Sequence, residues 1–349
     1  MIDRRLRDRY SRQIMFPGIG EDGQVKLTSS CVVIIGCGAL GCNIATLLVR
    51  AGVGRIRIID RDFIEYHNLQ RQVLFDEEDI KIGLPKAIAA ERHLRNVNSS
   101  VKIEGIVADV NYTNIERFCR GANVILDGLD NSETRLLIND VSLKHKIPWI
   151  YGGVIASNGM TMNIIPDETA CFRCFSDHVP EPGTMPTCET AGVLGTAPAL
   201  IGSLQATEAM KILVGSEEIN RKLIVVDIWR GTFHQLKIEP CKDCPACQGK
   251  YEFLGSRYVI KTTSLCGQSR AVQVVNTKVS EIALDELAAR LQNVGRINQN
   301  EFMLSFTADD HEIVVFRDGR AIIKNTIDES LAKELYNKYF LWGQVIPRS

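Results

Sequence analysis

The sequence lacks an excess of either charge. Its 349 residues include 41 Lys and Arg against 42 Asp and Glu, which gives a formal net charge of −1 at pH 7. Nucleic acids and anionic membranes attract proteins through a large positive charge, so this composition argues against both as partners. Positive charge is concentrated only near the start of the chain. From the charge pattern alone, this basic cluster is compatible with a solvated arm. The arginines concerned are Arg4, Arg5, Arg7, Arg9 and Arg12.

Long hydrophobic runs are also missing. No apolar run approaches the ~18 residues of a membrane-spanning helix, and no apolar stretch follows the basic start, as it would in a secretory signal. We therefore expect a cytoplasmic protein. In a reducing compartment the 11 cysteines are not expected to form disulfides, so metal ligands, reactive thiols and small buried residues are the alternatives.

The order of predicted elements indicates an α/β fold. Short β-branched runs alternate with helical patterns, and this alternation predicts a doubly wound, mostly parallel, Rossmann-like sheet that binds ligands at the carboxyl ends of its strands. A chain of this length exceeds what one core usually organises. We expect a large domain over residues 1–250 and a small α/β accessory domain over 258–349. The predicted strands of the large domain are 31–35, 55–60, 101–107, 124–127, 148–152, 160–165 and 223–229.

A glycine turn, GCGALG, follows the first predicted strand and opens a helix at residues 36–41. Glycines at such a turn let backbone N–H groups approach a phosphate, and the helix N-terminus favours negative charge. Asp60 lies 19 residues after Gly41, close to the spacing of ~20 at which an acid meets a ribose hydroxyl. Taken alone, the turn is compatible with NAD, FAD, ATP or S-adenosylmethionine.

The segment after Asp60 narrows these alternatives. A dehydrogenase has no need of the sequence Asn-Leu-Gln-Arg-Gln at residues 68–72. An enzyme that attacks the α-phosphate of ATP needs cations over the triphosphate, because negative charge develops there in the transition state. Arg71 and Lys86 are suitable, although an isolated Arg or Lys is usually solvated surface.

Two pairs of cysteines share the spacing Cys-x-x-Cys. Four thiolates satisfy a tetrahedral Zn²⁺ ion, and a two-residue spacer lets a tight turn present both sulfurs to it. A redox-active pair is the alternative. We predict one structural zinc site, with Cys241 as a spare residue, and the ligands Cys171, Cys174, Cys244 and Cys247.

An ordered set of motifs closely resembles the ThiF/MoeB family of adenylyltransferases, bacterial relatives of the ubiquitin-activating enzymes in thiamine and molybdopterin biosynthesis. The resemblance covers about residues 5–250. The C-terminal part resembles the extension of a longer bacterial ThiF-like subgroup. The motifs are RYSRQ (9–13), GCGALG, AGVGRIRIIDRD (51–62), NLQRQ (68–72), LPKA (84–87), DGLDN (127–131), CFRC (171–174), TCETAGV (187–193) and CPAC (244–247).

The resemblance implies a fold of the ubiquitin-activating-enzyme type and a site for ATP and Mg²⁺. It assigns Asp60 to the ribose, Asp130 to Mg²⁺ and the second Arg of RYxRQ, Arg12, to the neighbouring subunit's site, so a homodimer is expected. Ala39 departs from the Gly that relatives often have, but its side chain is small enough for close backbone approach. The nucleotide-binding residues are expected to be Gly36, Gly38, Ala39, Gly41, Asp60, Asn68, Leu69, Gln70, Arg71, Lys86, Asp130 and Asn131.

Cys188 lies in a loop rich in Pro and Gly, where the family has a reactive cysteine. A lone cysteine is more often a small buried residue, but this polar loop favours exposure. Its implied role is to accept the acyl group or sulfur in a thioester, acyl-disulfide or persulfide step after adenylation. Together with Arg12, Arg71, Lys86 and Asp130, it completes the expected catalytic set.

The implied function is ATP-dependent adenylation of the C-terminal Gly carboxylate of a ubiquitin-like sulfur-carrier protein, followed by sulfur transfer. A cysteine desulfurase persulfide is the expected sulfur donor. Three alternatives remain: a tRNA-modifying adenylating dehydratase of the same superfamily, an NAD-dependent oxidoreductase, and an inactive scaffold. Near-neutral charge argues against an RNA substrate, the NLQRQ segment and the cysteines against an oxidoreductase, and the presence of Arg71, Lys86 and Asp130 against a scaffold.

Overall fold

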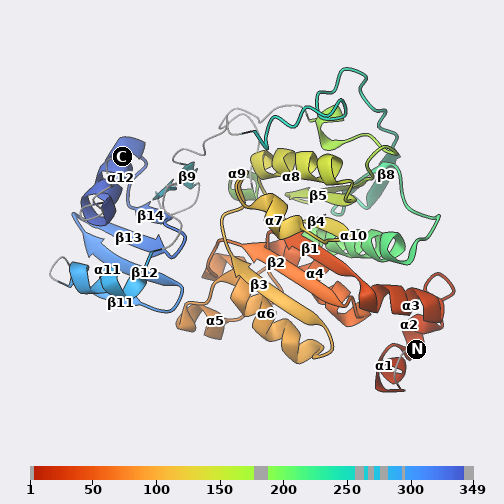
Figure 1. The fold of residues 1–349 in the computed structure, drawn as a ribbon, viewed down its shortest axis with the longest axis horizontal. Coiled ribbons are helices and arrows are strands. Elements are labelled where there is room, and N and C mark those ends of the chain that lie inside the picture. Colours follow the sequence, from red (N-terminus) through yellow and green to blue (C-terminus); the bar gives the residue numbers. More distant parts are fainter. Residues whose placement is uncertain are drawn as a thin grey trace, which may run out of the picture. The chain divides into compact units, whose positions relative to one another are not determined.

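The structure is a computed structural model that describes residues 4–176, 188–255, 263–265, 271–275, 282–292 and 295–341. The chain divides into two compact units, Met1–Arg257 and Tyr258–Ser349 (Figure 1). Among the described residues, no helix combines the length and the apolar composition needed to cross a membrane.

The first unit is built on an eight-stranded sheet with the order β3-β2-β1-β4-β5-β6-β7-β8. The strands from β3 to β5 are parallel, whereas β6, β7 and β8 are antiparallel to their neighbours. The strand order reverses between β1 and β4, which is where open α/β sheets bind ligands. The strands are β1 Cys31–Ile35, β2 Arg55–Asp60, β3 Lys102–Val107, β4 Val124–Asp127, β5 Trp149–Ile155, β6 Asn158–Ile164, β7 Leu223–Asp227 and β8 Thr232–Leu236.

Helices cover both faces of this sheet (Figure 1). Helices α4, α6 and α10 pack on one face, and α7 and α8 pack over a second cluster of buried side chains. The helical segments are α1 Arg4–Arg9, α2 Ser11–Ile14, α3 Gly20–Ser29, α4 Ala39–Ala51, η1 Tyr66–Asn68, α5 Glu77–Ile82, α6 Lys86–Val97, α7 Ile115–Cys119, α8 Ser132–His145, η2 Phe172–Cys174, α9 Cys188–Ala191 and α10 Thr196–Val214.

The predicted α/β class is confirmed, and β1, β2 and β4 have the predicted bounds. The predicted strand at 223–229 ends earlier, because the chain turns after Asp227 and returns as β8. Side chains of β8 are all exposed, so the strand has no alternation of apolar and polar residues that would mark it in the sequence.

The second unit contains a six-stranded antiparallel sheet with the order β11-β12-β13-β14-β10-β9. Apolar side chains of α11 and α12 pack against one face of it. With its sheet and two helices, this unit is a small α/β domain, as expected from the sequence. The elements are β9 Thr263–Leu265, β10 Ala271–Val274, α11 Leu284–Leu291, β11 Ile297–Gln299, β12 Met303–Ala308, β13 His311–Phe316, β14 Ala321–Lys324, α12 Glu329–Tyr336 and η3 Asn337–Leu341.

Candidate active site

The glycine turn joins β1 to the N-terminus of α4. Gly36 has a φ of +91°, and a Cβ on it would lie 2.6 Å from the carbonyl oxygen of Gly128. A Cβ on Gly41 would lie 2.1 Å from the oxygen of Gly36, so close backbone packing requires both glycines. Around Gly38 the space is open, since a Cβ there would meet nothing nearer than 3.8 Å. Ala39 begins α4 and has no positive φ, so the helix accommodates its methyl group.

Asp60 ends β2 and is fixed against the glycine turn. Its Oδ2 accepts a hydrogen bond of 2.6 Å from the Cys37 N–H, and its Oδ1 accepts one of 2.7 Å from the Asp62 N–H. Burial, and next the charge of Asp62, raise the pKa of this carboxyl above its usual range. The turn and the acid therefore form one hydrogen-bonded unit at the carboxyl ends of β1 and β2.

Lys86 begins α6 and lies buried among carboxylates. Its Nζ is 3.3 Å from Asp62 Oδ2. Burial alone would lower the pKa of Lys86, but Asp62, Asp60 and Asp130 raise it overall. The ammonium is therefore charged at neutral pH and lies within electrostatic reach of both acids predicted for the nucleotide and for Mg²⁺.

The NLQRQ segment forms the short helix η1 and the turn after it. Asn68 is buried, and its Oδ1 accepts a 3.0 Å hydrogen bond from the Glu65 N–H, so this amide shapes the turn. Arg71 is half-buried, and its Nη1 donates to the main-chain oxygen four residues earlier at 2.8 Å. Leu69 is half-buried and Gln70 is exposed.

The loop that holds Asp130 leaves the end of β4. Asp130 is exposed, and Asn131 caps α8 by accepting a 2.9 Å hydrogen bond from the Thr134 N–H. Buried Arg135 fixes the start of the loop: its Nε is 2.9 Å from Asp127 Oδ2. Its Nη2 donates to two main-chain oxygens, one in the loop at 2.6 Å and one in β5 at 2.8 Å. The loop is thereby held next to the switch in strand order.

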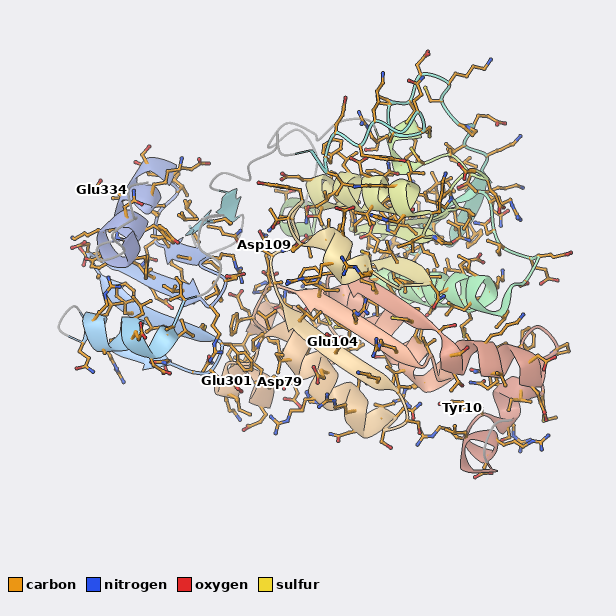
Figure 2. All side chains as sticks on the ribbon, viewed as in Figure 1. Tyr10, Asp79, Glu104, Asp109, Glu301 and Glu334 are labelled. Atoms are coloured by element: carbon orange, nitrogen blue, oxygen red, sulfur yellow. The ribbon has the colours of Figure 1, made fainter. Side chains whose placement is uncertain are left out.

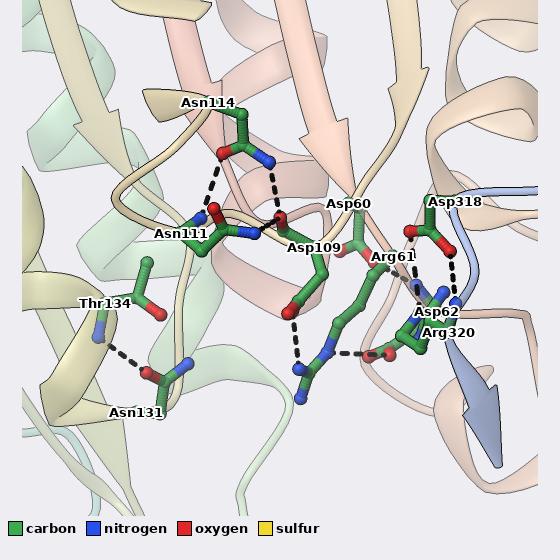
Figure 3. A network of polar contacts seen from close by, with 10 residues as sticks. All are labelled: Asp60, Arg61, Asp62, Asp109, Asn111, Asn114, Asn131, Thr134, Asp318 and Arg320. Carbon is green, nitrogen blue, oxygen red and sulfur yellow. Dashed lines mark hydrogen bonds and ion pairs between the residues drawn. The ribbon is translucent and has the colours of Figure 1, made fainter. Parts of the chain in front are cut away.

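A polar network joins the ends of β2 and β3 beside these residues (Figure 3). Arg61 Nη1 pairs with Asp109 Oδ1 at 2.7 Å, and its Nε lies 3.6 Å from Asp62 Oδ1. The main-chain oxygen of Asp109 accepts hydrogen bonds from Asn111 Nδ2 at 3.1 Å and from Asn114 Nδ2 at 2.8 Å. Charged groups therefore line the carboxyl ends of β2, β3 and β4.

The four predicted metal-binding cysteines come together. Their sulfurs lie within 4.8 Å of one another. The neighbouring pairs are 3.5 Å (Cys171 to Cys244), 3.7 Å (Cys171 to Cys174) and 3.7 Å (Cys174 to Cys247) apart. Four sulfurs about 2.3 Å from one tetrahedral Zn²⁺ ion would be about 3.8 Å apart, so the cluster is compatible with zinc. Cys241 is exposed and contributes only its N–H, which lies 3.3 Å from Cys174 Sγ.

Arg12 is not brought to the site of its own chain. It is exposed on α2, where its Nη1 lies 3.8 Å from Met15 Sδ. Tyr10 and Gln13 fix α2 to the far end of α4: Asn98 Nδ2 donates to the Tyr10 hydroxyl at 2.8 Å, and Gln13 Nε2 donates to the last carbonyl of α4 at 2.8 Å. Helix α4 has 13 residues, so about 20 Å separates this end from the glycine turn. Figure 2 labels Tyr10 and Asp109 at two different places on the first unit.

The Cys188 side chain lies outside the described residues, as does the loop 177–187 before it. The backbone is described from the start of α9 onward. Gly192 and Leu194 pair with the residue after β5, and a Cβ on Gly195 would lie 3.0 Å from the Gln70 oxygen. The segment that follows Cys188 therefore packs against the turn after η1.

Several groups around the site were absent from the sequence prediction. Gln72 is buried, and its Nε2 is the atom nearest to the position of a Cβ on Gly38; its place in the NLQRQ motif was a usable signal. Arg61 and Gly128 likewise belong to quoted motifs, at residues 51–62 and 127–131. Asp109 and Arg135 gave no such signal, because they lie outside every quoted motif.

Comparisons with known proteins agree with this geometry. The model of the ThiF family matches residues 10–246. The sulfur carrier protein ThiS adenylyltransferase of Bacillus subtilis is 42% identical over 335 residues, which cover 95% of this chain and 98% of that protein. The SAMP-activating enzyme E1 of Haloferax volcanii is 39% identical, with 70% of this chain and 90% of that protein covered.

A solved structure shares the fold. The crystal structure of E. coli MccB with ATP superimposes with a TM-score of 0.60 at 24% identity, and the match covers 69% of this chain and 74% of that one.

Proposed function

The chain belongs to the ThiF family, and on this premise we propose that it transfers the adenylyl group of ATP to the C-terminal carboxylate of a sulfur-carrier protein. It is an adenylyltransferase, and the products of this step are an acyl-adenylate and pyrophosphate. The observation that supports this most strongly is the 42% identity to a ThiS adenylyltransferase over nearly the full length of both chains. The carrier is therefore a ThiS-like protein that ends in Gly-Gly.

The nucleotide groups are assigned by their positions. The phosphates lie at the open space around Gly38, at the N-terminus of α4, where backbone N–H groups favour negative charge. Asp60 accepts the ribose hydroxyls. Lys86 and Arg71 neutralise charge on the triphosphate, with Asn68 shaping the turn that bears Arg71.

The attacking group needs no general base. A C-terminal carboxylate with a pKa of roughly 3.5 is already ionised at neutral pH. The residues therefore act by holding the carboxylate in line with the α-phosphorus and by offsetting the charge that develops. Lys86 is charged at that pH because the surrounding carboxylates raise its pKa.

Two metal ions fit the residues present. Asp130 offers an exposed carboxylate, the hard oxygen ligand that Mg²⁺ prefers, within electrostatic reach of Lys86. Bound there with ATP, Mg²⁺ would neutralise phosphate charge. The four-cysteine cluster would hold Zn²⁺ with no open position, so that zinc is structural.

Sulfur transfer follows adenylation in this proposal. Cys188 accepts the acyl group from the acyl-adenylate, which releases AMP, or it accepts the outer sulfur of a cysteine desulfurase persulfide, which releases the thiol of the desulfurase. The packing of the backbone after Cys188 supports this, because that segment lies against the turn that bears Arg71.

A homodimer completes the site. Arg12 is exposed at the end of α4 opposite to the glycine turn, so it can serve a nucleotide site only in a second copy of the chain. We place the dimer in the cytoplasm, where the cysteines stay reduced.

The proposed activity is tested by isotope exchange between pyrophosphate and ATP. Purified protein with MgATP and a ThiS-like carrier is expected to catalyse exchange, and a carrier that lacks its last Gly is the matched control. Exchange that does not depend on the carrier's C-terminus would contradict the proposal.

A further inference from the structure

Asp109 has a buried carboxylate oxygen that no hydrogen-bond donor in the described part of the chain reaches. The residue is 8% exposed, and its Oδ1 pairs with Arg61 Nη1 at 2.7 Å. Its Oδ2 is buried and has no hydrogen-bond partner among the described residues. Since an unpaired buried acceptor costs free energy, a ligand that donates a hydrogen bond to Oδ2 would relieve that cost.

The position of Asp109 beyond the end of β3 indicates which ligand would donate this hydrogen bond. Strands β2 and β3 are parallel, about 4.8 Å apart across the sheet, and Asp60 lies opposite Val107, the last residue of β3. Asp109 therefore lies two residues beyond the carboxyl end of the strand next to Asp60. On the proposed function, on which this inference rests, the phosphates lie at the end of β1 and the ribose at the end of β2. The base then extends toward the end of β3.

We propose that Asp109 selects adenine, by accepting a hydrogen bond from its exocyclic 6-amino group at Oδ2. A 6-oxo purine presents an oxygen at the same place, which a carboxylate repels. A purine without a substituent at C6 leaves Oδ2 unpaired. Asp109 is thus a specificity-determining residue for ATP over ITP and GTP.

The carboxylate is held rigidly for this task. Arg61 bridges Asp109 and Asp62, while Asn111 and Asn114 hold the main-chain oxygen of Asp109 (Figure 3). Because the guanidinium of Arg61 can only donate, it fixes which carboxylate oxygen faces it and leaves Oδ2 for the base. An acceptor fixed in advance discriminates more strongly than a mobile one.

The same constraint defines a variant that should reverse the preference. In Asp109→Asn, the amide oxygen must face Arg61, so the amide NH₂ takes the place of Oδ2 and becomes a donor. This variant should bind ITP better than the wild type does and bind ATP less well. Relative to wild type, the ratio of ATP affinity to ITP affinity should fall about 10- to 100-fold, the value of one hydrogen bond to a charged group.

The measurement is equilibrium binding of ATP, ITP and purine riboside triphosphate to the full chain. Wild-type protein should bind ATP about 10- to 100-fold more tightly than purine riboside triphosphate, which lacks only the amino group. This comparison uses only the wild-type protein, so it does not depend on whether a variant folds. Arg61→Gln is the comparison variant: it removes the same ion pair but leaves Oδ2 as an acceptor, so it should weaken the preference for ATP over ITP less than Asp109→Asn does and should not reverse it.

The outcomes separate the inference from the proposed function. Equal affinity of the wild type for ATP and purine riboside triphosphate would overturn the role of Asp109, as would an unchanged ATP-to-ITP ratio in Asp109→Asn. If Arg61→Gln shifts the ratio as far as Asp109→Asn does, the ion pair and not Oδ2 sets the preference, and the inference is wrong. Loss of carrier-dependent exchange in the wild type would instead refute the proposed function.

Discussion

At the scale of single residues, the positive charge of Lys86 is paired with carboxylates in the structure. Lys86 lies 3.3 Å from Asp62 and is also influenced by Asp60 and Asp130. When a triphosphate enters, the ammonium can exchange a carboxylate partner for a phosphate. The cation is thus already desolvated and charged before ATP binds, which lowers the reorganisation needed for reaction.

Removal of the Asp130 charge should abolish most adenylation. Asp130→Asn keeps the size of the side chain but weakens its hold on Mg²⁺, and one such electrostatic contact is worth about 10²- to 10³-fold in rate. Carrier-dependent pyrophosphate exchange should fall by that factor. Asp167→Asn, an exposed acid paired with Lys146, is the control and should leave exchange unchanged. Undiminished exchange in Asp130→Asn would remove Asp130 from the mechanism.

Cys188 should be dispensable for the first chemical step. Acyl-adenylate formation uses a carboxylate, ATP, Mg²⁺ and fixed positive charge, whereas transfer to a thiol needs an accessible thiolate. Cys188→Ala should therefore keep exchange near the wild-type rate and lose any enzyme–carrier adduct that a thiol reductant cleaves. An adduct that persists would show that another residue is the acceptor. Loss of exchange in a folded variant would place Cys188 in the nucleotide site.

The site residues that could be predicted from the sequence belong to local motifs. The glycine turn, Asp60 and the cysteine pairs stand at fixed spacings from their own strand, turn or partner, so their positions could be predicted. The motif DGLDN includes Gly128, but the reason for its small size could not be predicted. That reason is contact with Gly36, over 90 residues away, where a Cβ on Gly128 would lie 2.2 Å from the Gly36 oxygen. Asp109 could not be predicted either, because its proposed role depends on its position beside Asp60 at the end of β2.

At the scale of elements, α8 connects the nucleotide site to the cysteine cluster. Its N-terminus is capped next to Asp130, and two buried residues in its middle hold the segments around the cysteines. Asn139 Oδ1 accepts a 2.8 Å hydrogen bond from the Phe172 N–H, and Asp140 Oδ2 accepts one of 2.8 Å from the Phe253 N–H. Loss of metal would therefore loosen contacts along a helix that also begins at the active site.

Zinc binding should depend on Cys174 and not on Cys241. One zinc per chain is expected by metal analysis. Cys174→Ser should lose it and lower the thermal unfolding temperature or aggregate, because a structural zinc contributes directly to folding free energy. Cys241→Ser is the control, since only the backbone of that residue touches the cluster. Stoichiometric zinc in a Cys244→Ser/Cys247→Ser double variant would show that the ligands are others.

At the scale of the whole molecule, the proposed nucleotide site and Arg12 lie at opposite ends of α4. Two inactive variants should therefore complement each other. In a mixed dimer of Arg12→Ala and Lys86→Ala chains, one site combines an intact Lys86 with an intact Arg12 from the partner. Random mixing makes half of the dimers mixed, so exchange should recover to about a quarter of the wild-type level.

The control for complementation is each variant alone at the same total concentration. Both should be nearly inactive and dimeric by light scattering. A fully active monomer would contradict the trans arrangement of Arg12, and so would mixed dimers that stay as inactive as their parents.

The central claim is that this chain joins AMP to the C-terminus of a sulfur carrier, and the intact mass of the carrier tests it most directly. After incubation with enzyme, MgATP and pyrophosphatase, without a sulfur donor, the carrier should gain the mass of one adenylyl group. Fragmentation should place that group on the last Gly, and hydroxylamine should remove it. An unmodified carrier, or an adenylyl group on any other residue, would contradict the account.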